Sequence, residues 1–185
     1  MPNELIIEQC SPTLAGLKPA NMFSYRFRDL HEVICRIKEL NRKLSSKGIR
    51  FIPIQIKADL ALILCYRDDI LEEVLSDPES VRMLEDLGYS NGSLASLISQ
   101  LRARFSGGSF PHEVGIFLGY PCEDVRAFME HANEGCVYTG TWKAYSDPER
   151  ARKARERFSK CKRVYMQCYR NGSDLEKLTI KTKRR

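Results

Sequence analysis

The sequence has few of the features that mark metal sites, membrane spans or export. It contains no C-x-x-C pair and only 3 histidines, whereas structural zinc sites use ligand pairs roughly two to four residues apart. It has no run of about 18 apolar residues, and Met1 is not followed by a basic start and an apolar stretch. We therefore expect a soluble, cytoplasmic protein with no membrane contact. No residues are predicted as metal ligands, although a metal site assembled from distant cysteines is an open alternative.

The composition is that of a globular protein. Of 185 residues, 43% are hydrophobic and 29% are charged, which excludes a disordered chain and a collagen or coiled-coil rod. A chain of this length usually forms one domain, so we predict a single domain over residues 1–175 and a basic tail over 176–185. The 7 cysteines are an odd number in a chain without an export signal, which indicates reduced thiols.

Helix signals dominate the first part of the chain. Ser11 is a good N-cap and Pro12 suits the first helical position, so a short helix is predicted to begin there. Asp29 and Glu32 form a capping-box pair before an apolar stripe of helical period. A second helix is therefore predicted from this pair to Gly48, where the stripe ends.

A hairpin and several helices are predicted next. Two β-branched, apolar runs at 49–56 and 60–66 flank a short polar turn, which is typical of antiparallel strands. Pro53 cannot donate to a sheet ladder, so the first strand should lie at an edge. The helical segments that follow are predicted at 69–75, 78–87 and 94–105.

The last part of the chain combines one strand with a long helix. Residues 136–145 have the pattern of a strand around Trp142. Asp147 and Pro148 then cap a long helix that ends at Gly172 and buries a single apolar seam. Together these elements predict an α+β fold, rich in helix, with a small antiparallel sheet and a long basic C-terminal helix.

Residues 113–128 have the spacing of a helix-turn-helix corner. Gly115 permits a close helix crossing and Gly119 makes the turn. Glu123 and Asp124 occupy the start of the second helix, where a DNA reader presents donors to bases and phosphates. We therefore interpret this segment as a packed helical corner.

The basic charge of the chain is local. Residues 141–185 contain 15 Lys and Arg against 5 Asp and Glu, although the whole chain carries a net charge of only +6. A basic helix can neutralise phosphates, so one hypothesis is that the protein binds nucleic acid or an acidic partner. Its contact residues would be Arg152, Arg155 and Lys162. The other interpretation is a solvated helix face, because the helix lacks exposed aromatics that stack on bases.

Cys10 is the leading candidate for a reactive side chain. It directly precedes the predicted helix start at Ser11, and the positive end of a helix lowers the pKa of a thiol. His112, which begins an apolar segment, is the best candidate for a general base, with Glu113 as a candidate orienting group. The competing interpretation makes Cys10 a small buried hydrophobe and His112 a helix-start residue.

These residues define a first functional hypothesis, a thiol-dependent enzyme acting on a small anionic or acyl substrate. Cys10 would be its nucleophile or redox thiol. Its substrate-binding residues would be Lys18, Asn21, Tyr120 and Lys143. A further alternative is a metal- or redox-sensing protein that uses Cys136, Cys161 and Cys168. The sequence indicates no particular cofactor.

Three blocks of the sequence resemble a known bacterial family. They are CSPTLAGLKPANMF at 10–23, FPHEVGIFLGYP at 110–121 and GTWKAY at 140–145. Together they resemble the domain of unknown function 3793 family, found mainly in anaerobic bacteria, over nearly the whole chain. Ala144 stands where the family pattern usually has valine, a difference that concerns packing. The resemblance implies a soluble, cytoplasmic, single-domain protein and brings no established activity.

Overall fold

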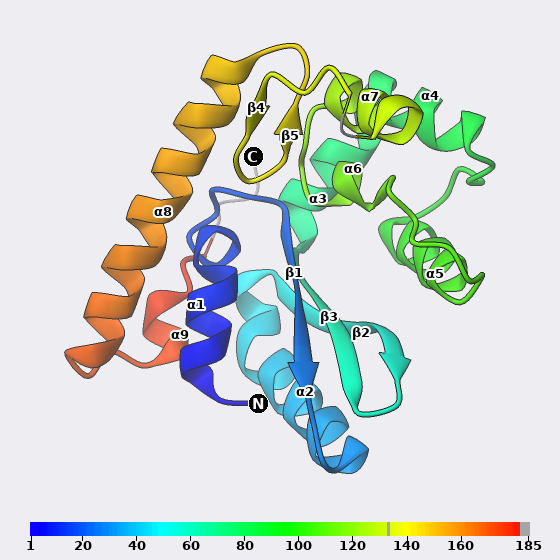
Figure 1. Ribbon diagram of the computed structural model, residues 1–185. Coiled ribbons are helices and arrows are strands. Elements are labelled where there is room, and N and C mark those ends of the chain that lie inside the picture. Colours follow the sequence, from blue (N-terminus) through cyan, green and yellow to red (C-terminus); the bar gives the residue numbers. More distant parts are fainter. Residues whose placement is uncertain (133, 182–185) are drawn as a thin grey trace. The chain divides into compact units, whose positions relative to one another are not determined.

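A computed structural model describes residues 1–132 and 134–181 (Figure 1). These residues divide between two units, one containing Met1–Leu71 and Cys161–Arg185 (unit 1) and the other containing Glu72–Lys160 (unit 2). The predicted α+β class and the long C-terminal helix, α8 (Pro148–Arg170), are confirmed. The single domain over residues 1–175 stays a prediction.

Unit 1 is built on a three-stranded antiparallel sheet with the strand order β1-β3-β2. The strands are β1 (Ala20–Arg26), β2 (Ile49–Lys57) and β3 (Leu60–Arg67). The predicted hairpin of β2 and β3 is confirmed, and β2 lies at an edge, as Pro53 requires. The register of this hairpin shifts between Pro53 and Gln55. Strand β1 was not predicted.

Two helices pack on one face of this sheet, α1 (Asn3–Leu14) against β1 and β3, and α2 (Leu30–Leu44) against β2 (Figure 1). The start of α2 is as predicted, because the Asp29 side chain accepts a hydrogen bond from the backbone N–H of His31 at 2.8 Å. A 3-10 turn, η1 (Ser45–Lys47), follows α2 and ends at Gly48 with φ at 77°.

The predicted start of the first helix at Ser11 is wrong. Helix α1 begins at Asn3, and both Ser11 and Pro12 lie inside its last turn. Ile6, Cys10 and Leu14 are four residues apart and fully buried, so the apolar stripe extends through Pro12. Proline interrupts only one helical hydrogen bond there, and the Ser11 hydroxyl donates to the carbonyl of Ile7.

The chain re-enters unit 1 within α8, at Cys161, and continues with the short helix α9 (Leu175–Leu178). Leu175 is 5% exposed and joins the core of unit 1. The backbone N–H of Ile180 donates to the carbonyl of Leu14 at 3.1 Å, and the Lys47 ammonium donates to the carbonyl of Thr179 at 2.9 Å. Residues 176–180, predicted as a tail, are therefore bonded to unit 1, while 182–185 lie outside the described residues.

The helices predicted after the hairpin are confirmed. They are α3 (Asp68–Ser76), α4 (Pro78–Asp86) and α5 (Leu94–Phe105). Asp77 and Ser93 cap the last two of them, with side chains that accept from Glu79 N–H at 3.0 Å and from Ser96 N–H at 3.3 Å.

The predicted helical corner is also confirmed, as α6 (Val114–Phe117) followed by α7 (Cys122–His131). A Cβ atom at Gly115 would lie 2.7 Å from the Cγ2 atom of Val125, so only glycine allows this approach. Gly119 makes the turn as predicted, with φ at 75°, and Leu118 beside it is buried.

The single strand predicted over 136–145 is wrong. This segment of unit 2 is a hairpin of two very short strands, β4 (Tyr138–Thr139) and β5 (Lys143–Ala144), which form a sheet of their own. The chain reverses between them, where the backbone N–H of Gly140 donates to the carbonyl of Trp142 at 2.9 Å. Asp147 then caps α8 by accepting from Arg150 N–H at 2.9 Å.

Candidate functional site

Cys10 lies in the core of unit 1. Its side chain is 0% exposed, in the second half of α1 and away from the positive end of the helix at Asn3. The expected activation of its thiol by a helix start is therefore wrong. A catalytic role for Cys10 stays a prediction, without that support.

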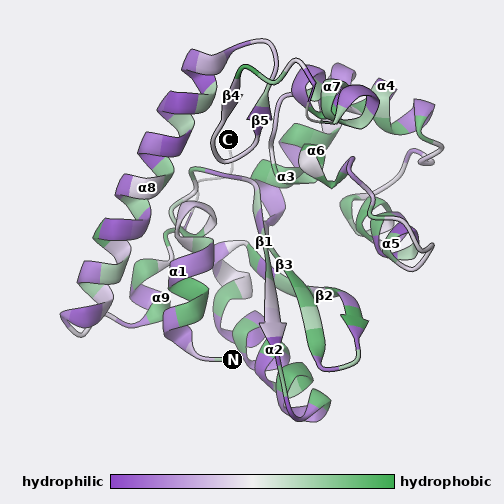
Figure 2. Ribbon diagram, in the orientation of Figure 1, coloured by the Kyte–Doolittle hydropathy of each residue, from purple (hydrophilic) through white to green (hydrophobic). Residues whose placement is uncertain are grey.

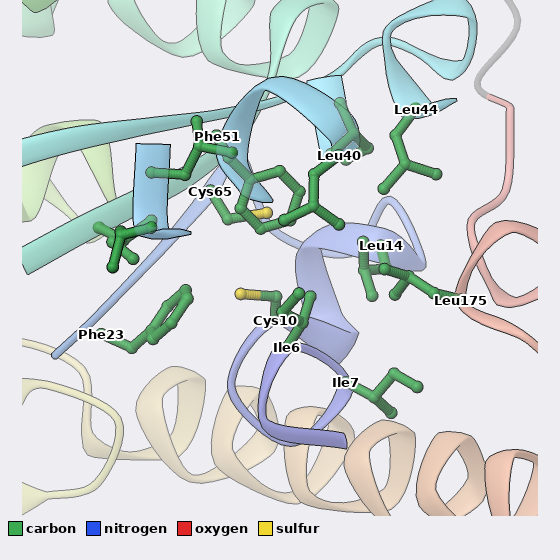
Figure 3. Packing of buried hydrophobic residues seen from close by; sticks show 14 of the residues in the cluster. Ile6, Ile7, Cys10, Leu14, Phe23, Leu40, Leu44, Phe51, Cys65 and Leu175 are labelled. Carbon is green, nitrogen blue, oxygen red and sulfur yellow. The ribbon is translucent and has the colours of Figure 1, made fainter. Parts of the chain in front are cut away.

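The surroundings of Cys10 are apolar, apart from one other thiol. Figure 3 shows the sulfurs of Cys10 and Cys65 between α1 and the sheet, among Ile6, Phe23 and Phe51. Burial raises the pKa of the Cys65 thiol well above its ordinary value, and a hydrogen bond with Cys10 adds to this. This environment favours the neutral thiol of Cys65, which is a poor nucleophile.

Lys18 and Asn21 lie in the same part of unit 1. Lys18 is only 4% exposed, in the segment that joins α1 to β1. Burial lowers the pKa of Lys18 to about 8, and the neighbouring Cys10 sulfur partly opposes the shift. Asn21 is paired with Cys65 across the sheet and accepts a hydrogen bond from the Thr13 hydroxyl at 2.8 Å. The structure thus gathers the residues of the 10–23 block at the end of α1.

Sequence reasoning missed Arg67, the largest fully buried side chain of the described residues. Its guanidinium donates to the carbonyls of Thr13 and Leu14 at 2.9 and 2.7 Å, at the C-terminal end of α1, where a positive charge is favoured. It also donates to the carbonyls of Lys47 at 3.1 Å and Ile180 at 2.9 Å. The sequence feature that could have indicated its burial is its position, since Arg67 directly continues the apolar run of strand β3.

His112 and Glu113 belong to unit 2, so their predicted pairing with Cys10 of unit 1 stays a prediction. The buried Glu113 carboxylate accepts from the Tyr89 hydroxyl at 3.2 Å and pairs with the Arg104 guanidinium at 3.4 Å. That guanidinium lies 4.4 Å above the Tyr89 ring. Burial, and then the Glu113 charge, raise the pKa of Tyr89. These contacts give Glu113 a structural role in unit 2.

The side chain of His112 is exposed, in contact with two aromatic rings. Its ring centroid lies 5.3 Å from that of Phe110 and 5.0 Å from that of Phe128. The Lys143 ammonium lies 5.4 Å from the centroid of the Phe128 ring. The structure thus brings His112 and Lys143 to the same aromatic side chain, Phe128.

Asp124 holds the 140–145 block against α7. It is 2% exposed, and its carboxylate accepts from Trp142 Nε1 at 2.7 Å and from the backbone N–H of Tyr145 at 2.8 Å. The ring of Tyr120 stacks on that of Trp142, with centroids 5.3 Å apart and an interplanar angle of 26°. Burial raises the pKa of Tyr120 to about 12. Two of the three sequence blocks therefore meet in unit 2.

Helix α8 carries charge along most of its length, which Figure 2 shows as repeated hydrophilic bands. Ala151 and Cys161 are its buried residues, and most of its Lys and Arg side chains are exposed. Arg152 is exposed and pairs with Glu149, and Arg155 is exposed and donates to the Tyr138 hydroxyl at 3.5 Å. These two predicted contact residues are thus accessible.

Lys162, the third predicted contact residue, differs from the other two. It is half-buried, and its ammonium donates to the Glu8 carboxylate of α1 at 3.0 Å, within unit 1. This ion pair reduces the charge that Lys162 offers to a ligand.

Metal-ligand clusters and long apolar helices were sought among the described residues. Within 1–132 and 134–181, no group of three or more His, Cys, Asp and Glu side chains is arranged to hold a metal ion. Over the same residues, none of the helices combines the length and apolar character that a bilayer crossing requires. Of the cysteines proposed as sensors, Cys136 lies in unit 2 and Cys161 and Cys168 in unit 1.

The fold and the sequence blocks define a helix-rich α+β protein with a basic C-terminal helix. The chain belongs to the family described as "Protein of unknown function (DUF3793)", whose model matches residues 6–179. The family expected from the three sequence blocks is thereby confirmed. No curated protein and no solved structure matches the chain.

Proposed function

We propose that this protein binds nucleic acid through the exposed side of α8, chiefly by contacts to phosphates. The observation that carries the proposal is the concentration of charge in one helix. Helix α8 holds nine Lys and Arg against two acidic residues, Glu149 and Glu156, within 23 residues. The remaining basic and acidic residues of the chain are 21 and 22, so the charge is not a general property of the surface.

The spacing of the exposed arginines suits a nucleic-acid backbone. Arg152, Arg163 and Arg170 are separated by nearly whole numbers of helical turns, so they project from one side of α8 over about 27 Å. Successive phosphates of one DNA strand advance by about 3.4 Å along the axis. Several phosphates can therefore face this row at once.

Internal ion pairs do not neutralise the row. Arg152 shares Glu149 with Lys153, whose ammonium lies 3.4 Å from that carboxylate. Lys160, Arg163 and Arg170 are exposed and form no ion pair with another described residue. The second half of α8 is thus the part of the helix best able to release counterions from a polyanion.

The test compares two variants of equal net charge by fluorescence anisotropy with a labelled oligonucleotide. The first variant is Lys160→Glu, Arg163→Glu and Arg170→Glu on α8. The matched control reverses three exposed basic residues of unit 1, Arg28→Glu, Lys38→Glu and Lys57→Glu. We expect the wild type to bind more weakly as salt rises, and the α8 variant to lose roughly tenfold or more in affinity and about three units of the salt slope.

The control variant should bind nearly as well as the wild type. Equal losses in both variants would mean that only net charge matters, and wild-type binding that is absent or indifferent to salt would also overturn the proposal. Circular dichroism of the three proteins establishes that each is folded.

A further inference from the structure

Unit 2 presents a row of aromatic rings that neither the family assignment nor the proposed role of α8 explains. Phe105 ends α5 and is 2% exposed, and Phe110 meets it edge-on with centroids 5.3 Å apart and planes at 88°. His112 and Phe128 continue the row, with centroid distances of 5.3 and 5.0 Å. The row therefore begins in the core of unit 2 and ends at the surface.

The outer members of the row are accessible. Phe110 is 49% exposed, His112 is exposed and Phe128 is half-buried. An aromatic side chain left half in water loses part of the free energy that its burial would supply. Together, Phe110, His112 and Phe128 form an exposed aromatic surface, which we call the ring surface.

The backbone around the ring surface is held by hydrogen bonds. The N–H of Val114 donates to the carbonyl of Pro111 at 3.1 Å, and the N–H of Gly115 donates to the carbonyl of His112 at 3.1 Å. Phe128 is fixed by its position in α7, whose corner with α6 is closely packed at Gly115. A ligand that stacks on these rings would have little conformational entropy to remove from them.

One cationic group of unit 2 lies beside the rings. The Lys143 ammonium is 5.4 Å from the centroid of the Phe128 ring. At the other end of α7, the Arg150 guanidinium of α8 pairs with Glu123 at 3.6 Å. Phe128 is five residues beyond Glu123, which is about 7.5 Å along the helix. The start of α8 and the ring surface are therefore connected through one short helix.

Resting on the proposed nucleic-acid function, we infer that the ring surface stacks on unpaired bases, so that the ligand is a single-stranded nucleic acid. Aromatic rings beside a cation, Lys143, match the alternation of bases and phosphates in a flexible strand. Phe and His are both used for stacking on splayed bases, and they accept any base because each base has a π face. In a duplex the faces of the bases are occupied by their neighbours.

The experiment uses the full chain and three labelled probes of about 12 nucleotides. They are oligo(dT), a duplex of the same length, and a strand of the same length with abasic sites. The test variant is Phe110→Ala with His112→Ala. The matched control is Met129→Ala with Val137→Ala, which removes two exposed apolar side chains of unit 2 outside the ring surface. A third variant, Phe110→Trp, keeps the capacity to stack if the alanine variant folds poorly.

We expect the alanine variant to lose roughly tenfold or more in affinity for oligo(dT) and to bind the duplex and the abasic strand as the wild type does. The control and Phe110→Trp should retain wild-type affinity for oligo(dT). The inference is overturned if the alanine variant and the control bind oligo(dT) equally, if the abasic strand binds as tightly as oligo(dT), or if the wild type prefers the duplex.

The same probes separate this inference from the proposed function. If reversal of charge on α8 abolishes binding but the alanine variant retains the wild-type preference for oligo(dT), the role of α8 stands and the ring surface is rejected. If the charge-reversed variant binds normally and only the alanine variant fails on oligo(dT), the ring surface stands and the role of α8 is rejected.

Discussion

Two buried cations, Arg67 and Lys18, lie near the end of α1. Arg67 donates to four backbone carbonyls, so its burial is compensated by hydrogen bonds. Burial lowers the pKa of Lys18 from 10.5 to about 8, and an electrostatic interaction with Cys10 partly opposes the shift. The unfolded chain therefore holds a proton on Lys18 over a pH range in which the folded chain does not.

This difference predicts how stability depends on pH. Because the unfolded state binds more protons between about pH 8 and pH 10.5, the free energy of unfolding should rise with pH in that window. Between about pH 7.5 and pH 9.5 the gain should be about 2 kcal/mol relative to Lys18→Met. Urea unfolding of both proteins at each pH measures it. Taking the difference between the wild type and Lys18→Met at each pH removes most of the contribution of the buried thiols, whose titration changes the free energy of unfolding in the opposite direction. If the two proteins show parallel pH profiles, the prediction is contradicted.

The candidate site was only partly accessible to sequence reasoning, and Cys10 illustrates why. The cysteine next to Ser11 and Pro12 was visible, but the helix was given the wrong start because a capping pattern was preferred to the apolar stripe of Ile6, Cys10 and Leu14. The residues next to Cys10 in the sequence do not indicate that Phe23 will pack near it. That packing depends on the pairing of β1 with β3.

The helices and strands with strong local sequence signals were predicted. Those whose formation depends on contacts with distant segments of the same chain were not. Helix α2 has a cap, a regular stripe and a glycine stop, and α5 was placed at its observed bounds. In strand β1, Asn21, Phe23 and Tyr25 lie on the same face of the sheet as Cys65. The strand is short, however, and its position depends on its pairing with β3. The 140–145 segment failed for a related reason, since Asp124 and the turn at Gly140 determine its shape.

The crossing of α6 and α7 gives a prediction about Gly115. Alanine there would place its Cβ atom 2.7 Å from Val125 Cγ2 and 3.3 Å from Tyr120 Cδ2. We expect Gly115→Ala to lower the free energy of unfolding by about 1–3 kcal/mol, since overpacking outweighs the gain in helix propensity. The double variant Gly115→Ala with Val125→Ala should lose less free energy of unfolding than the sum of the losses of the two single variants, because the smaller side chain at 125 removes the clash. Additive losses in urea unfolding would argue against the clash.

The two units raise the question of whether the chain unfolds in one step. Helix α8 is continuous from Pro148 to Arg170, with its first half in unit 2 and its second half in unit 1. An interruption of the helix between the halves would cost helical hydrogen bonds in both. The single domain predicted for residues 1–175 stays a prediction until this is measured.

Trp142, the single tryptophan of the chain, lies in unit 2 and provides the test. For one cooperative domain, its fluorescence and the far-ultraviolet circular dichroism of the whole chain should change at the same urea concentration. Fluorescence that changes at a distinct midpoint would show instead that the units unfold separately. The Lys18→Met variant is a useful companion, since in a single domain it must shift both signals together.

The bonding of residues 175–180 to unit 1 has a consequence for how the chain matures during translation. Unit 2 has all its residues once position 160 has been synthesised, whereas the core of unit 1 still lacks Leu175 and the Arg67 guanidinium still lacks the Ile180 carbonyl. Domains tend to fold as units while the chain emerges from the ribosome. Residues 1–71 of unit 1 are therefore made before unit 2 but completed after it, and the core around Cys10 and Cys65 lacks its last packing partners until residues 175–180 have been synthesised.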